Sequence, residues 1–353
     1  MKATLFALSA LLLFQEAAIT EELARRSDAP PERYANADLE IGMVRDARGQ
    51  KLRTLTTVPR ATGRQPGILL VGWLSCDSIE LRLDAKDGIS RLLRQMIAEG
   101  NAVLMRLDKP GVGDSEGDCR ETDFETELSG YRSAFAALRA HSRVDAARIM
   151  LLGISNGGGF APLVANGAPV AGYVSIGGWS KTWFEHMIEL ERRRLALAGR
   201  AAGAINAEMK LLALLHAEYL LKLRTPAEVI SAHPNLQSVW YDEPKHQYGR
   251  PAAFYHQLQA LDLAAAWAKV AAPTLVVWGE YDWIMSRDDQ TNIVELVNAH
   301  GPGRARLLSV PRMDHSFTTH PNAKTAFESM GAGAYPAEAA AEIIKFLRAT
   351  SAK

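Results

Sequence analysis

The order of apolar and polar positions along the chain predicts strands that alternate with helices. Between short apolar runs, apolar residues recur at helical spacing, as Ile89, Leu92, Met96 and Ile97 do. The runs themselves have the length of buried strands and lie at residues 68–71, 102–106, 149–152, 170–176, 274–278 and 307–310. Parallel strands need crossover connections, which helices usually supply. The pattern therefore predicts an α/β fold, with a mostly parallel, doubly wound sheet covered by helices on both faces.

An antiparallel hairpin is expected ahead of these strands. Residues 40–44 and 51–58 are extended runs joined by a polar turn. The hairpin would add an antiparallel edge to the sheet.

A helix start is also predicted at Thr122, because Glu125 follows three residues later in the spacing of a capping box.

One long segment, residues 179–256, lacks the strand pattern. Its apolar residues, such as Trp183 and Met187, recur at helical spacing. We expect this segment to be a helical cap inserted into a core formed by residues 35–178 and 257–353. The segment holds five histidines that we expect to be structural or surface residues, namely His186, His216, His233, His246 and His256.

Length and charge narrow the possible functions. The chain has 353 residues, enough for one large domain with an insertion or for two modest domains. Its 40 Lys and Arg residues equal its 40 Asp and Glu residues, so it lacks the positive field with which nucleic-acid binders attract phosphate backbones. We expect a small-molecule substrate and no nucleic-acid partner.

The first residues resemble a secretory signal. Met1 and Lys2 precede an apolar run at 3–14 and a stretch of mostly small residues at 17–20. The run is shorter than the ~20 apolar residues that span a bilayer, so no transmembrane span is expected. We expect residues 1–20 to be a signal peptide that exports the protein. An amphipathic N-terminal helix on a cytoplasmic protein is the alternative.

A nucleophile motif follows the predicted strand 149–152. Residues 153–157 read Gly-Ile-Ser-Asn-Gly, in which glycines on both sides of Ser155 allow a tight turn between a strand and a helix. Gly158 and Gly159 would let that helix approach the sheet closely. Such a turn lifts a serine hydroxyl above the sheet edge, so Ser155 is the candidate nucleophile.

A serine nucleophile needs a base and a group that orients the base. Asp282 lies just after the strand 274–278, and His315 lies in the loop after the last strand. We expect Asp282 to orient His315 and His315 to accept the serine proton. Glu280 and His320 are the rivals in the same two loops.

Backbone amides should stabilise the oxyanion that forms during acyl transfer. The N–H of Asn156 is one candidate donor, and the N–H of Trp73, in the loop after strand 68–71, is the other. Leu74 could take the place of Trp73. No H-E-x-x-H or similar ligand pattern occurs, so we expect neither a metal nor a cofactor.

Four segments together resemble the α/β-hydrolase superfamily. They are residues 108–117, 153–157, 279–282 and 313–315, and the resemblance spans about residues 40 to 350. It implies the chain order serine, acid, histidine, which the candidates follow. Val71 departs from the pattern, because many relatives have histidine there. A serine at the nucleophile position argues against dehalogenases, which use a carboxylate.

The resemblance implies a two-step reaction through an acyl-enzyme. We expect carboxylic esters as substrates, with thioesters or with peptides and amides as alternatives for the same triad. A non-catalytic binding protein built on the same scaffold is a further alternative. A rate panel of esters, thioesters and anilides would separate these functions.

The chain has two cysteines, Cys76 and Cys119, too few for a zinc site. In the superfamily that the chain resembles, the strands 68–71 and 102–106 are usually neighbours. The resemblance therefore implies that the loops carrying the cysteines lie near each other, within reach of a disulfide. Two free thiols are the alternative, and export would favour the bond.

Overall fold

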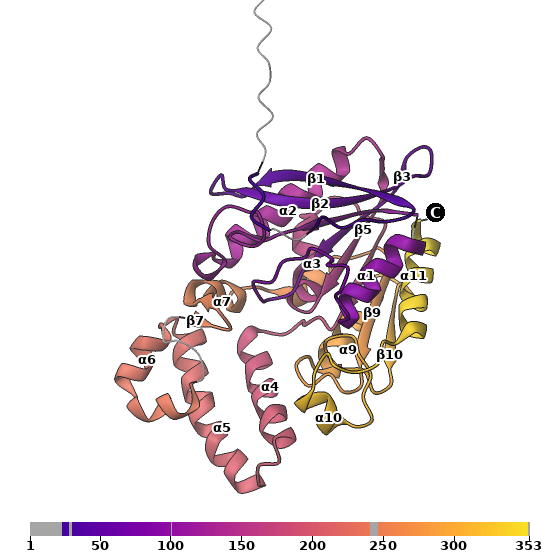
Figure 1. Ribbon diagram of the computed structural model, residues 1–353. Helices are drawn as coiled ribbons and strands as arrows, with labels where there is room; N and C mark the ends of the chain where they lie inside the picture. The colour runs from indigo at the N-terminus through magenta and orange to yellow at the C-terminus, as the bar shows by residue number, and fades with distance from the viewer. Residues whose placement is uncertain (1–22, 28–29, 100, 241–245, 352–353) are drawn as a thin grey trace, which may run out of the picture.

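The structure is a computed structural model, and it describes residues 23–27, 30–99, 101–240 and 246–351 (Figure 1). The expected signal peptide, residues 1–20, lies outside the described residues.

An eight-stranded sheet forms the centre of the molecule, in the order β1-β2-β4-β3-β5-β6-β9-β10. The strands are β1 Ala37–Arg45, β2 Lys51–Pro59, β3 Gln65–Val71, β4 Val103–Leu107, β5 Val144–Ile154, β6 Gly172–Ile176, β9 Thr274–Gly279 and β10 Ala305–Val310. Within this sheet, as far as the chain is described, β1 with β2 and β2 with β4 are the antiparallel pairs. The mostly parallel sheet and its antiparallel hairpin are therefore confirmed.

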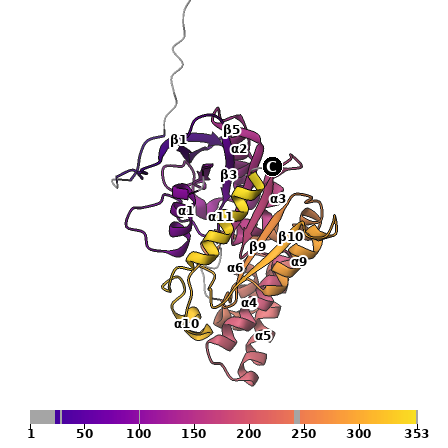
Figure 2. The same cartoon turned by 90° about the vertical axis from the view of Figure 1, so that its right-hand side faces the viewer.

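Helices cover both faces of the sheet (Figure 2). Alternate strand residues pack to opposite sides, so that Leu69 and Leu151 join one apolar cluster and Ile68 and Leu152 join the other. The first cluster includes α2 Phe124–Ala140, α3 Asn156–Ala165, α8 Leu263–Trp267 and α9 Arg287–Asn298. The second includes α1 Gly88–Glu99 and α11 Ala337–Ser351, which contact each other. In the described parts of the chain, no helix is both long and apolar enough to cross a membrane.

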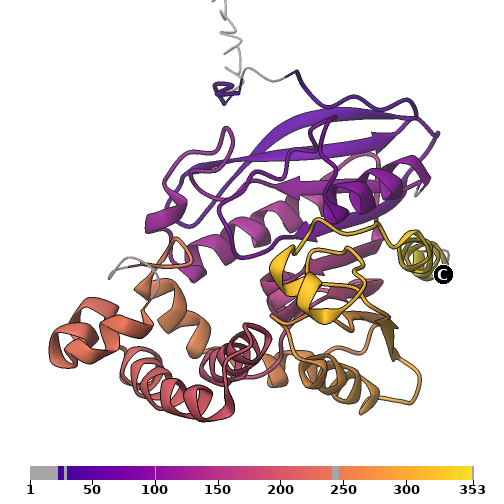
Figure 3. The same ribbon diagram turned by 60° about the horizontal axis from the view of Figure 1, so that its bottom comes forward.

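The segment between β6 and β9 is largely helical and projects from one side of the sheet (Figures 1 and 3). It contains α4 Trp183–Leu197, α5 Ala202–His216, the π-helical turn η2 Ala217–Leu221, α6 Pro226–Ala232, the 3₁₀ turn η3 Pro234–Val239 and α7 Ala252–Gln259. The segment also contains two short strands that pair in antiparallel fashion, β7 His246–Gln247 and β8 Arg250–Pro251. The sequence did not predict them. The expected boundary at residues 256 and 257 falls inside α7, which packs against α2 and α4.

The start of α2 differs from the prediction by one residue. Asp123, not Thr122, caps the helix, because the Asp123 carboxylate accepts from the Thr126 amide at 2.8 Å. Thr122 instead ends the short 3₁₀ turn η1 Cys119–Glu121, and its hydroxyl donates to the Asp118 carbonyl. Aspartate caps a helix as well as threonine does, so the carboxylate one position later provides the cap.

Candidate active site

Ser155 lies at a sharp turn between β5 and α3, with φ 56° and ψ −123°. A non-glycine residue in this region is strained, and such strain gathers at functional sites. The flanking glycines are required by packing. A Cβ on Gly153 would lie 2.4 Å from the Gly157 carbonyl oxygen, and one on Gly157 would lie 2.2 Å from the Val71 carbonyl oxygen. The glycines of the motif therefore let the turn form against β3.

Three side chains from distant parts of the chain meet above the sheet edge. The Nε2 atom of His315 lies 2.8 Å from the Ser155 hydroxyl, and its Nδ1 atom lies 2.8 Å from Oδ2 of Asp282. The second carboxylate oxygen of Asp282 accepts from the amides of Ile284 at 2.9 Å and Met285 at 2.8 Å. Because both oxygens are bonded, the Asp282 carboxylate is fixed in orientation and holds the imidazole in turn.

The surroundings of His315 stabilise its protonated, positively charged form. Burial lowers the pKa of His315, whereas the negative charge of Asp282 and the hydrogen bond to Asp282 raise it. The raising effects are larger together, so the pKa of His315 lies above the ordinary histidine value. An imidazole in this setting is a stronger base than a free one. The arrangement suits proton transfer from Ser155.

The two rival residues have other partners. Glu280 is exposed, and its carboxylate accepts from the backbone amide of Arg312 at 2.9 Å. His320 is buried, and its Nε2 atom lies 2.8 Å from Oδ2 of Asp314. Neither side chain has a hydrogen bond to Ser155 or His315 in the described structure.

The loop after β3 is tied to the start of α3. The Gly157 amide donates to the Gly72 carbonyl at 3.0 Å, and the Gly72 amide donates to the Tyr131 hydroxyl at 3.0 Å. In a trans peptide the carbonyl and the N–H point in opposite directions. The bond to Gly72 therefore also fixes the direction of the Trp73 N–H. In the described part of the chain, the amides of Trp73 and Asn156 donate no hydrogen bond that would occupy them.

Lys109 holds the next part of this loop. Its buried ammonium donates to the carbonyls of Trp73 and Ser75, the latter at 3.0 Å, and lies 3.5 Å from Glu127. Burial lowers the pKa of Lys109 to about 8. The stretch 108–117, one of the four segments on which the resemblance rests, thus contributes a cation that anchors the loop carrying Trp73.

Cys76 and Cys119 form a disulfide in the structure, with an S–S distance of 2.02 Å and their Cα atoms 5.9 Å apart. The strands that precede them, β3 and β4, are parallel neighbours. Arg250, which is fully buried, contacts both sulfurs and pairs with Glu127. The disulfide and Lys109 therefore tether the same loop, and Arg250 links it to the inserted segment.

The sequence assigned no functional role to His186, which was expected to be a structural or surface residue, although His186 lies near His315 and Asp282. This residue lies one helical turn after Trp183 on α4, and the two rings are 4.7 Å apart. Burial lowers the pKa of His186 to about 3, and the charges of His315 and Asp282 also act on it. Its position on the apolar face of α4, three residues after Trp183, was the available signal.

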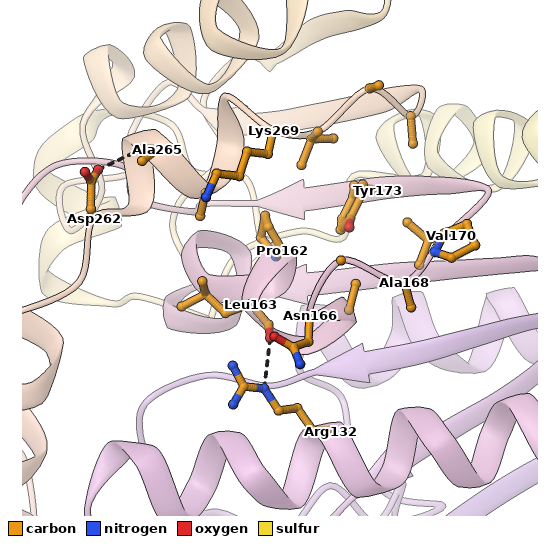
Figure 4. Close-up of a pocket in the computed structure, with 17 residues that line it drawn as sticks. Arg132, Pro162, Leu163, Asn166, Ala168, Val170, Tyr173, Asp262, Ala265 and Lys269 are labelled. Atoms are coloured by element: carbon orange, nitrogen blue, oxygen red, sulfur yellow. Dashed lines mark hydrogen bonds between the residues drawn. The ribbon is translucent and has the colours of Figure 1, made fainter.

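A cavity of about 690 Å³ lies away from these residues, between the end of α3, the start of β6 and α8 (Figure 4). Tyr173, Pro162 and Lys269 are among its lining residues, and none of Ser155, Asp282 and His315 is. It is thus separate from the candidate active site. In the part of the chain that the structure describes, no group of three or more His, Cys, Asp or Glu residues could hold a metal ion.

Solved structures of esterases share the fold. The Pyrococcus furiosus esterase is 12% identical with a TM-score of 0.53, covering 92% of this chain and 97% of that one. Carboxyl esterase 2 from Tuber melanosporum is 15% identical with a TM-score of 0.54, covering 91% and 90%. Acetyl xylan esterase 1 from Thermoanaerobacterium is 14% identical with a TM-score of 0.53, covering 93% and 87%. At these identities the similarity shows the fold alone.

A comparison with protein families identifies the family of the chain as well as its fold. No curated protein matches the chain. Residues 86–322 match the family described as serine aminopeptidase, S33. The match covers more than half of the chain and includes the nucleophile turn and the loops that carry Asp282 and His315. The chain therefore belongs to the serine aminopeptidase, S33, family of α/β hydrolases.

Proposed function

We propose that the protein is a serine hydrolase that cleaves carboxylic esters through an acyl-enzyme. The observation that carries the proposal is the continuous chain of hydrogen bonds from Ser155 through His315 to Asp282, placed at a strained turn. This geometry matches the roles of nucleophile, base and orienting acid. The family and the esterase fold neighbours support hydrolytic chemistry.

In the proposed reaction, the Ser155 hydroxyl attacks the ester carbonyl carbon while Nε2 of His315 accepts its proton. The resulting oxyanion accepts hydrogen bonds from the amides of Asn156 and Trp73. When the tetrahedral intermediate collapses, His315 protonates the departing alcohol and an acyl-Ser155 ester remains. Water then attacks this ester with His315 again as base, which releases the acid and restores Ser155.

The family description raises an aminopeptidase as the second candidate. Such an enzyme needs a carboxylate for the substrate's α-ammonium group. Two buried carboxylates of the neighbouring segments already have partners: Asp289 on α9 accepts from Ser180 and Ser286, and Asp314 accepts from Thr318. This favours an ester, which needs no ammonium site.

A rate panel tests the two candidates. Esters, thioesters, anilides and aminoacyl anilides that share one acyl group would be compared by kcat/KM. We expect the ester to exceed the matched anilide by orders of magnitude. A higher kcat/KM for aminoacyl anilides would establish the peptidase instead. Absence of turnover together with absence of fluorophosphonate labelling would indicate a non-catalytic protein.

Residues 179–256 are proposed to cap the site. Arg193 on α4 donates to the carbonyls of Trp283 and Ile284, in the loop that carries Asp282. These bonds hold α4 beside the acid.

Export of the protein is proposed as well, because a disulfide persists in oxidising compartments.

The activity should depend on pH through His315. The imidazole must be neutral to accept the Ser155 proton, so kcat/KM should rise with pH through the His315 pKa. Because that pKa is raised, we expect the midpoint to lie above about 6.5. A profile from pH 5 to 9 with a substrate that does not ionise measures it. A midpoint below the ordinary histidine value would contradict the proposed pair with Asp282.

Loss of the disulfide should reduce activity before the protein unfolds. The two cysteines of the bond are 43 positions apart in the sequence. In the chain-entropy model, removal of the bond should therefore lower the free energy of unfolding by about 4 kcal/mol. It also frees the loop carrying Trp73, and losing one oxyanion donor typically costs ~10²- to 10³-fold in rate. We expect dithiothreitol to lower kcat more than it raises KM while circular dichroism is unchanged.

The variant Cys76→Ser with Cys119→Ser is the control, because dithiothreitol should have no effect on it. Two freely alkylated cysteines in the non-reduced protein would show that the bond does not form.

A further inference from the structure

Several of the buried polar atoms without hydrogen-bond partners belong to side chains on α4, on α5 and next to Ser155. Asn156 leaves both side-chain atoms unpaired, and His216 leaves both ring nitrogens unpaired. Trp183 Nε1, His186 Nδ1 and Gln247 Oε1 are also unpaired in the described structure. Each of these five side chains is at most 2% exposed. Native proteins pair about nine tenths or more of such atoms, so the grouping calls for a reason.

Contacts link these side chains to one another, and Gln247 joins them through its Nε2 atom, which lies 3.9 Å from Sδ of Met187 on α4. Asn156 follows the nucleophile, and its carbonyl accepts from the indole of Trp179 at 3.3 Å. The ring of Trp179 lies 5.0 Å from that of Trp183, which lies 4.7 Å from that of His186. His186 is close enough to lower the pKa of His216 further. The unpaired groups thus extend from Ser155 along α4 to the end of α5.

These atoms need partners from outside the chain. An unpaired buried polar group is destabilising, and so many together would offset most of the stability of an ordinary domain. Water or a ligand must therefore pair with them. Leucine or phenylalanine at these positions would line a pocket for an alkyl chain without leaving any buried polar group unpaired. The polar side chains indicate that a bound molecule supplies hydrogen-bonding groups.

The neighbourhood is neutral and rich in rings. Burial lowers the pKa of both His186 and His216 to about 3, so both are uncharged at neutral pH. Asparagine, glutamine and tryptophan carry no charge. Arg193, whose charge acts on His186, is bonded to backbone carbonyls, and Arg250, the strand partner of Gln247, is paired with Glu127. Trp183 also packs 5.6 Å from Tyr255. The groups suit a flat or cyclic ligand with neutral donors and acceptors.

We propose that Asn156, Trp183, His186, His216 and Gln247 form a recognition subsite for a neutral ring that bears hydroxyl groups, within the ester substrate. The inference rests on the proposed function. The aromatic rings would pack on the body of the substrate ring. The unpaired nitrogens and oxygens would bond its hydroxyls.

Two pairs of esters test the subsite in the full-length protein. The acyl pair is methyl 3-phenylpropionate and methyl 3-(4-hydroxyphenyl)propionate, and the alcohol pair is the monoacetates of cyclohexanol and of 1,4-cyclohexanediol. We expect the hydroxylated member to have about tenfold higher kcat/KM in at least one pair. The pair that responds shows whether the ring lies on the acyl or the alcohol side. Equal or lower values for the hydroxylated members in both pairs would overturn the proposal.

Variants separate recognition from general damage. His186→Phe should bring the ratio of the two kcat/KM values close to one, because phenylalanine keeps the ring and removes the nitrogens. His256→Phe is the matched control, since His256 is a partly buried histidine of the same segment whose Nε2 atom is already paired with the Arg224 carbonyl at 3.2 Å. It should keep the wild-type ratio. An unchanged ratio in His186→Phe would overturn the role of His186.

The wild-type ratios decide the proposal even where a variant fails to fold. His216→Phe provides a second variant with the same expected loss of preference. If the wild type hydrolyses none of the four esters and no other ester, the proposed function has failed. If it hydrolyses them without preferring the hydroxylated member, only the subsite has failed.

Discussion

Replacing Ser155 by alanine is expected to abolish turnover, with a loss in kcat on the order of 10⁶-fold, as in serine proteases that lose the nucleophile. The hydroxyl is the atom that would form the acyl-enzyme, and His315 has no other proton donor at 2.8 Å in the described structure. Ser155→Ala should also lose all labelling by a fluorophosphonate probe. Its folding should be intact, because among the described residues the hydroxyl bonds to His315 alone.

Ser129→Ala provides the matched control. Ser129 lies on α2, and its hydroxyl donates to the Thr126 carbonyl. This variant should keep wild-type turnover and labelling. Undiminished labelling of Ser155→Ala would show that another residue is the nucleophile.

Replacing Asp282 by asparagine is expected to lower kcat by about 10⁴-fold, the effect of the same change in the serine-protease triad. The local hydrogen bonds give the reason. Oδ1 accepts from the amides of Ile284 and Met285, so the asparagine oxygen should stay in that position. Its NH₂ group would then face Nδ1 of His315. That favours the tautomer with the proton on Nε2, which cannot accept the Ser155 proton.

The pH profile gives an independent readout for Asp282. The aspartate charge is what raises the His315 pKa, so Asp282→Asn should move the acid limb of the residual activity to lower pH. Glu280→Gln is the control, because glutamine can still accept from the Arg312 amide. It should change kcat less than about threefold. If Glu280→Gln were the more damaging variant, the orienting role would belong to Glu280.

Local patterns in the sequence predicted most of the fold. All six apolar runs are strands of the sheet, and the polar turn after 40–44 joins β1 to β2. Periodicity and turn chemistry act over about ten residues, so they can be recognised without a structure. The start of α2 was wrong by one residue because Thr122 and Asp123 are both good capping residues, and only the backbone conformation chooses between them.

By itself, the sequence determined the sharp turn that carries the candidate nucleophile, since the steric need for Gly153 and Gly157 around Ser155 is local. It also predicted Asp282 as the candidate acid and His315 as the candidate base, with Glu280 and His320 as rivals in the same two loops. Only the tertiary structure decided that His315 contacts Ser155 and that Asp282 contacts His315, because these contacts join residues 160 and 33 positions apart. The polar neighbourhood around His186 also depends on how α4 and α5 pack beside the sheet. No local pattern encodes that packing, because each of its residues is ordinary on its own helix and becomes unusual only when its neighbours leave it unpaired.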